Sequence, residues 1–178
     1  MSKYATLIAI DQSSSKSGIA VFDGTDLMRR DIIKLPASVP ADRRNIEMMH
    51  QIEVLLQRYQ PDTVIIEDVQ MQKSVYPVII LARLQGMIMA LCDRYKVDCK
   101  MYLPTTWRKQ LGFQQGKGVT RQDLKQQATD FVNASYGINV GEDVSEAICI
   151  GLAHLNYIGA LPTEKNERMK KPHDSKEA

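Results

Sequence analysis

The chain has 178 residues, of which 44% are hydrophobic and 25% are charged, and its formal net charge is +2. This composition predicts one globular domain with a real core, and the small net charge excludes a strong global field for nucleic acid. We expect residues 1–160 to form the domain and the charged residues 161–178 to form a disordered tail. The three cysteines (Cys92, Cys99 and Cys149) lack metal-type spacing, which predicts reduced thiols and a cytoplasmic protein. We find no signal segment and no apolar run near the length of a membrane span.

The first predicted elements are three short apolar runs at residues 4–10, 18–22 and 31–35, separated by turn-rich segments. This pattern is typical of an antiparallel meander. A helix is predicted over residues 41–59, because apolar residues recur there every three or four positions. Residues 63–66 form a nearly continuous apolar run, which is typical of a central strand covered on both faces.

The second half alternates helices with one more strand. We expect helices at 75–95, 121–136 and 143–159, and a fifth strand at 97–103. The order predicts an α/β fold with a mixed five-stranded sheet, made of the meander plus two parallel strands and flanked by helices.

The predicted helix at 75–95 is apolar almost all round, so it must bury two sides. One side belongs against its own sheet. The other is covered either by a partner subunit or by the last helix and a loop, as in an ordinary core helix. Sequence alone leaves both coverings open.

Several apolar elements end or begin at carboxylates. Asp11 closes the first strand, Glu67 closes the fourth, and Asp143 and Glu146 lie three residues apart at the start of the last helix. Strand ends and a helix N-terminus meet in one crevice of an open sheet, so we expect the four to converge. Two such charges about 4 Å apart repel by roughly 4 kcal/mol at an effective dielectric near 20, which favours a bound cation. Oxygen ligands without His or Cys suit Mg²⁺ or Mn²⁺.

Each carboxylate also has a structural interpretation. Asp143 and Glu146 fit a capping box with Asp143 as the N-cap. Asp11 fits a turn, and Glu67 fits an exposed strand end. The shared position at one edge of the sheet favours the metal site.

The segments IAIDQSSSKSGIAVF, VIIEDVQ, LARLQGMIMAL and DVSEAICIGLAH occur in this order. In residues and spacing they resemble the RuvC-type Holliday-junction resolvases, in a divergent form such as bacteriophages carry. The resemblance implies a ribonuclease H-like fold, a homodimer through the helix at 75–95, and two Mg²⁺ ions per site. It also implies nicking of two opposed strands of four-way DNA, leaving 5′-phosphate and 3′-hydroxyl ends. By position, Asp11, Glu67, Asp143 and Glu146 match the four metal-binding acids.

Two positions depart from that family. Glu146 stands where bacterial members usually carry Asp, so its coordination is longer or passes through water. Gln70 and Met71 stand where an aromatic residue often inserts at the junction, and Tyr76 is the nearest ring. We therefore expect weaker sequence selectivity in cleavage.

Basic residues gather between Trp107 and Lys125. Lys117 lies between two glycines, where the backbone can approach a phosphate, and Thr120 can cap the next helix. The resemblance implies that Lys117 or Arg121 serves DNA binding and catalysis, and we take Lys117 as the catalytic candidate. The expected DNA-binding residues are Lys16, Lys73, Tyr76, Arg108, Lys109, Lys117, Arg121 and Lys125. Trp107 and His154 are expected to be packing residues, and basic residues of the tail to add salt-sensitive affinity.

Other functions remain open from sequence. A related nuclease could act on RNA–DNA hybrids or on other branched DNA. An actin-like or sugar-kinase-like ATPase also opens with a strand, an Asp and a small polar loop, although such enzymes need two domains. A DNA-binding scaffold without catalysis would not require four convergent acids.

Overall fold

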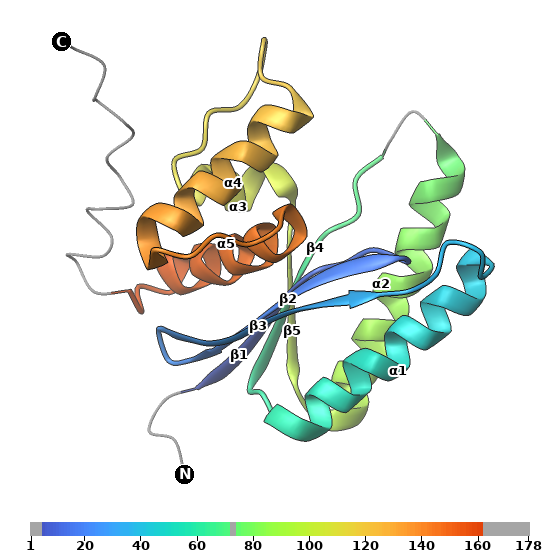
Figure 1. Ribbon diagram of the computed structural model, residues 1–178. Coiled ribbons are helices and arrows are strands. Elements are labelled where there is room, and N and C mark those ends of the chain that lie inside the picture. Colours follow the sequence, from blue (N-terminus) through green and yellow to red (C-terminus); the bar gives the residue numbers. More distant parts are fainter. Residues whose placement is uncertain (1–4, 72–73, 162–178) are drawn as a thin grey trace, which may run out of the picture.

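The computed structural model describes residues 5–71 and 74–161 (Figure 1). These residues form a five-stranded sheet in the order β3-β2-β1-β4-β5. The strands are β1 (Thr6–Asp11), β2 (Lys16–Asp23), β3 (Asp26–Lys34), β4 (Thr63–Glu67) and β5 (Asp98–Tyr102). Strands β1, β2 and β3 pair antiparallel, whereas β4 runs parallel to both β1 and β5. The predicted meander with two added parallel strands is confirmed.

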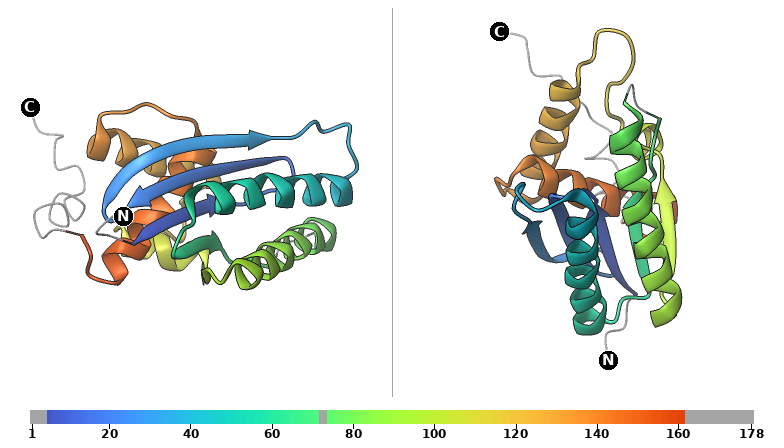
Figure 2. Two further views of the ribbon diagram at one scale, coloured as in Figure 1. Left: turned by 90° about the horizontal axis from the view of Figure 1, so that it is seen from below. Right: turned by 90° about the vertical axis from the view of Figure 1, so that its right-hand side faces the viewer.

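Helices cover both faces of this sheet. They are α1 (Ala41–Tyr59), α2 (Val75–Tyr95), α3 (Pro104–Gln110), α4 (Arg121–Tyr136) and α5 (Glu142–Tyr157). Helices α1 and α2 lie side by side on one face, and α5 crosses the other face with α3 and α4 beside it (Figures 1 and 2). The result is a three-layer α/β arrangement.

The alternation of side chains along β1 explains why both faces are apolar. Leu7 and Ala9 join the core beneath α5, while Ile8 and Ile10 join the core beneath α1 and α2. Successive side chains of a strand point to opposite faces, so one continuous apolar run feeds two cores. This confirms the central position predicted for such strands.

Two elements differ from the sequence expectation. Strand β3 begins at Asp26, five residues before the expected start, because its first half is largely exposed and holds no continuous apolar run. Helix α3 was not predicted at all. Its seven residues are too few for an amphipathic repeat, although Pro104 at its first turn is a usual helix-start signal.

The apolar helix at 75–95 has the predicted bounds and an open side. Ile80, Leu84, Ile88, Leu91 and Cys92 are buried against the sheet. By length and composition alone, α2 is the one helix within the described residues that could cross a membrane, which corrects the expectation that no apolar run is that long. Only 28% of its most apolar window is buried inside this chain. Within residues 5–71 and 74–161, α2 is therefore not roofed on both sides as the alternative of an ordinary core helix requires.

The expected boundary between domain and tail stays a prediction. Leu161 is buried in the core beneath α5, one residue beyond the expected end of the domain. The remaining residues of the expected tail, 162–178, and Lys73 lie outside the described residues.

Gly18 marks the closest approach between the sheet and α5. It pairs with Asp11 across β1 and β2, and a Cβ atom built on it would lie 1.9 Å from the backbone oxygen of Asp143. Only a residue without a side chain allows α5 to begin against β2 at this point. The glycine therefore brings the start of α5 to the end of β1.

Replacing Gly18 with alanine should lower the free energy of unfolding by about 2–3 kcal/mol, because the new methyl group meets backbone that cannot move aside. Gly141→Ala is the matched control, since a Cβ there meets nothing within 4 Å and the weaker N-cap preference of alanine should cost no more than about 1 kcal/mol. Urea denaturation compares the two variants. Equal stability of both would contradict the close approach.

Candidate active site

Asp11 and Glu67 are the last residues of two neighbouring parallel strands. Ile10 of β1 pairs with Ile66 of β4, so the two carboxylates follow at the same edge of the sheet. Along each strand they share a face with Ala9 and Ile65, whose side chains lie in the core beneath α5. The strand period thus sends both acids towards α5.

Helix α5 presents the other two acids at its first turns. Asp143 lies in the first turn and Glu146 follows three residues later, on the same side of the helix. The N-cap is Gly141, and the helix has no side-chain cap. The capping-box interpretation of Asp143 and Glu146 is therefore wrong, which leaves both carboxylates available to the site.

The negative charges of all three other acids act on the Asp11 carboxylate. Its pKa is raised well above 3.8, first by loss of hydration and then by the charges of Glu146, Glu67 and Asp143. Like charges disfavour the ionised form, so each of these carboxylates lies close enough to act on Asp11. This shift in the pKa of Asp11 is the effect that the predicted convergence of the four acids would produce.

Three of the acids have polar partners from this chain. The indole Nε1 of Trp107 donates a hydrogen bond of 2.8 Å to Glu67 Oε2. Arg108 Nη2 donates to Glu146 Oε1 at 3.0 Å, and Lys16 Nζ forms an ion pair with Asp143 Oδ2. Both Trp107 and Arg108 come from α3, the helix missed in the sequence.

The hydrogen bond from Trp107 changes the balance at Glu67. Burial raises the pKa of Glu67, while the Trp107 donor and the charge of Arg108 lower it. These two α3 residues therefore favour the charged form of a carboxylate that burial alone would neutralise. Trp107 is fully buried, so the expected packing role is confirmed, but the sequence did not reveal its polar one.

The acids do not form a ready ligand set as they stand. Across residues 5–71 and 74–161, no group of three or more His, Cys, Asp or Glu side chains is arranged to hold a metal ion. The donor chemistry nevertheless fits a hard divalent cation, because all four candidates offer carboxylate oxygens and Asp11 carries a repelled charge. The metal site therefore stays a prediction.

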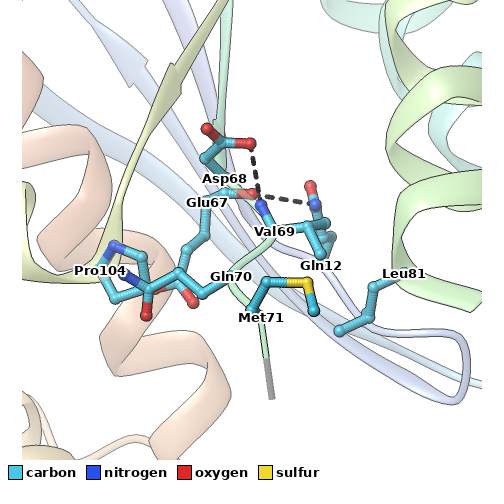
Figure 3. Close-up of a pocket in the computed structure, with 8 residues that line it drawn as sticks. All are labelled: Gln12, Glu67, Asp68, Val69, Gln70, Met71, Leu81 and Pro104. Atoms are coloured by element: carbon cyan, nitrogen blue, oxygen red, sulfur yellow. Dashed lines mark hydrogen bonds between the residues drawn. The ribbon is translucent and has the colours of Figure 1, made fainter. Parts of the chain in front are cut away.

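A cavity of about 120 Å³ adjoins Glu67 at the end of β4 (Figure 3). Gln12 lines it and donates through Nε2 to the backbone oxygen of Glu67 at 2.9 Å. Gln70 and Met71, which occupy the place of the expected aromatic residue, line it as well. The segment after the second acid thus borders an open space beside the carboxylates. Gln12 was not among the predicted site residues, because no motif distinguishes it from a turn residue.

The predicted basic residues separate into two groups. Lys125 and Arg121 lie on α4 near the acids, since the charge of Lys125 lowers the pKa of Asp11 and that of Arg121 lowers the pKa of Glu67. Lys125 also pairs with Glu142 at 2.6 Å. Lys16 contacts Asp143, as described above. Lys16, Arg121 and Lys125 therefore place positive charge near the four acids.

The other basic candidates lie further out. Lys117 is exposed between Gly116 and Gly118, which have φ of 105° and 87°, and no contact with the acids is seen in the described part of the chain. Lys109 and Tyr76 are also exposed. Thr120 caps α4 in a capping box with Asp123, as predicted.

His154 is a packed residue, as expected. It is 8% exposed near the end of α5, and its Nδ1 lies 2.8 Å from the hydroxyl oxygen of Tyr102. The pKa of His154 is lowered, mainly by burial. It belongs to the core at the far end of the helix from Asp143.

The arrangement is similar to that of known structures. T. thermophilus RuvC, solved in complex with a Holliday junction substrate, matches with a TM-score of 0.69 and 14% identity over 88% of this chain and 96% of the other. The yeast mitochondrial Holliday junction resolvase matches with a TM-score of 0.55 and 11% identity over 91% of this chain and 82% of the other. These similarities establish the fold, which is the predicted ribonuclease H-like α/β class.

The sequence identifies the family within that class. Residues 7–154 match the family described as crossover junction endodeoxyribonuclease RuvC. The curated RuvC of Thermomicrobium roseum is 20% identical over 162 residues, which are 89% of this chain and 98% of the relative. That of Corynebacterium jeikeium is 26% identical over 126 residues, which are 69% and 74% of the two chains. The chain belongs to the RuvC family of crossover junction endodeoxyribonucleases.

Asp11→Asn should raise the melting temperature of the metal-free protein by several degrees near about pH 7, because the amide keeps the shape and removes a repelled charge. The folded pKa lies above the ordinary 3.8, so the destabilisation by native Asp11 is full above the folded pKa. It fades as the pH falls through the folded pKa and is absent below 3.8. Melting curves in chelator across this range measure the gain.

Asp130→Asn on the exposed side of α4 is the control and should change the melting temperature little at any pH. A gain for Asp11→Asn that does not depend on pH would contradict the repelled charge.

Proposed function

We propose that this protein is a structure-selective endonuclease that resolves four-way DNA junctions by paired nicks in opposed strands. The observation that carries the proposal is the convergence of three carboxylate charges on Asp11, at the edge where β1, β4 and α5 meet. Membership of the RuvC family supports the junction as substrate. It favours this reaction over the actin-like phosphotransferase that the first strand and loop also suggest.

Divalent cations belong to this proposal. We infer that Asp11, Glu67, Asp143 and Glu146 hold two Mg²⁺ ions, with Mn²⁺ as a substitute. When bound, such ions supply Lewis-acid chemistry for phosphodiester hydrolysis, with 5′-phosphate and 3′-hydroxyl ends as products. Asp11 is the central residue of this ligand set, because the charges of the strand acid Glu67 and of both helix acids act on it.

The chain's own residues orient the DNA backbone. Arg121 and Lys125 place positive charge beside the acids, and Lys16 lies at the rim on Asp143. We assign them to the phosphates that flank the cleaved bond. Lys117, held between two glycines in an exposed loop, is the candidate for a further phosphate contact and for a catalytic role. Lys109 and Tyr76 are exposed and able to contact DNA arms.

A second copy of the chain completes the proposal. The outward side of α2 carries Ile79, Ala82, Gly86 and Met89 at three- and four-residue spacing, and all four are exposed. A Cβ atom on Gly86 would meet nothing within 4 Å, so packing inside this chain does not require a glycine there. A glycine in a helix interior costs about 1 kcal/mol relative to alanine, and close approach of a partner helix offsets this.

The two-fold symmetry of such a homodimer would present two acidic edges to the two like strands of a symmetric junction. Other branched DNA, or RNA–DNA hybrids, are the second candidate substrates, since a metal-dependent nuclease site acts on any phosphodiester it can reach. The reaction requires access to cellular DNA, so we place the protein in the cytoplasm of a bacterial cell.

Asp11→Asn should lower the rate of junction cleavage by more than about 100-fold while junction binding persists, because it removes the central metal ligand and leaves the basic residues intact. Purified protein is incubated with four-way, three-way, flap and linear duplex DNA, with and without Mg²⁺. Symmetric paired nicks on the four-way substrate are expected from the native protein only. Cleavage that persists in chelator would overturn the proposal.

Met89→Glu should weaken dimerisation by at least about 100-fold, because symmetry buries two unpaired charges in one interface. The control is Met28→Glu on β3, since Met28 is 65% exposed and Met89 is 43% exposed, on opposite parts of the fold. Sedimentation reports the mass of each variant in solution. Dimers of unchanged affinity for Met89→Glu would refute the interface on α2.

A further inference from the structure

Helix α3 delivers two consecutive residues to two different acids. Trp107 donates to Glu67 at the end of β4, and Arg108 donates to Glu146 on α5. The two α3 side chains also contact each other, because the guanidinium carbon lies 4.7 Å from the centre of the indole ring. This cation–π geometry fixes the guanidinium plane while its Nη2 faces the carboxylate. One short helix therefore ties a strand acid to a helix acid.

The Arg108–Glu146 pair is buried, unlike the other ion pair of the site. The side chains of Arg108 and Glu146 are 14% and 10% exposed, whereas that of Lys16, which contacts Asp143, is 48% exposed. Water screens the charge of Lys16, but it screens the charge of Arg108 little. Arg108 is thus the least screened positive charge paired with one of the four acids in the described part of the chain.

We propose that Arg108 is a positioning residue, a built-in counter-ion that keeps the four acids assembled while no divalent ion is bound. The inference rests on the metal site proposed above. It replaces the DNA-binding role that the sequence suggested for Arg108. Trp107 assists by holding the guanidinium and by orienting Glu67.

A counter-ion role for Arg108 explains how the fold holds four mutually repelling carboxylates at one edge. Four carboxylates at one edge repel one another, yet three of them have a partner from this chain. Removal of one member of a buried pair is strongly destabilising, because the remaining charge stays buried without compensation. Without Arg108, the acids need an external cation. With Arg108, the fold tolerates the metal-free state.

The geometry also leaves one part of Arg108 unused. Its Nε is buried and has no hydrogen-bond partner among the described residues. A contact of the partly exposed guanidinium with a DNA phosphate is the competing role, and the experiment must separate it from the counter-ion role.

The experiment measures the melting temperature of Arg108→Met in chelator and in saturating Mg²⁺. Methionine keeps much of the aliphatic length but removes the charge. We expect a loss of about 6–12 °C in chelator, the scale for breaking a buried ion pair in a domain of this size, and less than about 3 °C in Mg²⁺. Arg108→Lys should recover most of the loss. Lys109→Met, an exposed charge on the same helix, is the control and should melt like the native protein under both conditions.

Each other outcome overturns the proposal. Equal losses in chelator and Mg²⁺ would show a packing role, and unchanged melting with weaker junction binding would show a DNA contact. If Arg108→Met does not fold in chelator, Glu146→Gln is added, and the double variant should fold because the uncompensated charge is gone. A native protein that Mg²⁺ does not stabilise would instead refute the proposed metal site, independently of Arg108.

Discussion

The repulsion between carboxylates at one edge of the sheet is the constraint on which the site depends. Asp11 loses hydration beside three like charges, which is unfavourable for a folded chain unless something offsets it. The described structure offsets it with an indole donor, a buried guanidinium and a rim lysine. Each of these partners stabilises one acid, whereas no hydrogen bond or ion pair to the Asp11 carboxylate is seen in the described part of the chain, where the charge of Lys125 acts on it from α4.

The topology makes this repulsion unavoidable. Parallel pairing of β1 with β4 puts Asp11 and Glu67 at one edge, and the two-residue strand period turns both towards α5. Gly18 then lets the backbone of Asp143 pass at a distance no side chain would permit. The close packing of these carboxylates costs stability and has no structural benefit. We therefore interpret the acidic cluster as functional.

The sequence predicted the elements with strong periodicity and missed the contacts between them. The apolar runs and helical repeats predicted the antiparallel meander with two added parallel strands and the bounds of α1, α2 and α4, because burial imposes these patterns locally. The position of Asp11 and Glu67 followed from where apolar runs stop. Helix α3 has no such repeat, and the partnerships of Trp107 and Arg108 join residues 40 and 38 positions apart in the chain. Only tertiary packing defines them.

The open side of α2 and the acidic edge are physically connected. Gln85, on α2, donates through Nε2 to Asp68 at 2.9 Å and accepts from the backbone N–H of Val69 at 3.2 Å. These contacts fasten the segment directly after Glu67 to the same helix whose outer side the described residues leave uncovered. A partner that packs on α2 therefore fixes a helix that already supports the second acid and the cavity beside it. In a symmetric dimer, α2 would form the interface and would also hold the segment that follows Glu67. The distance between the two acidic edges would then be set by helix packing rather than by flexible loops.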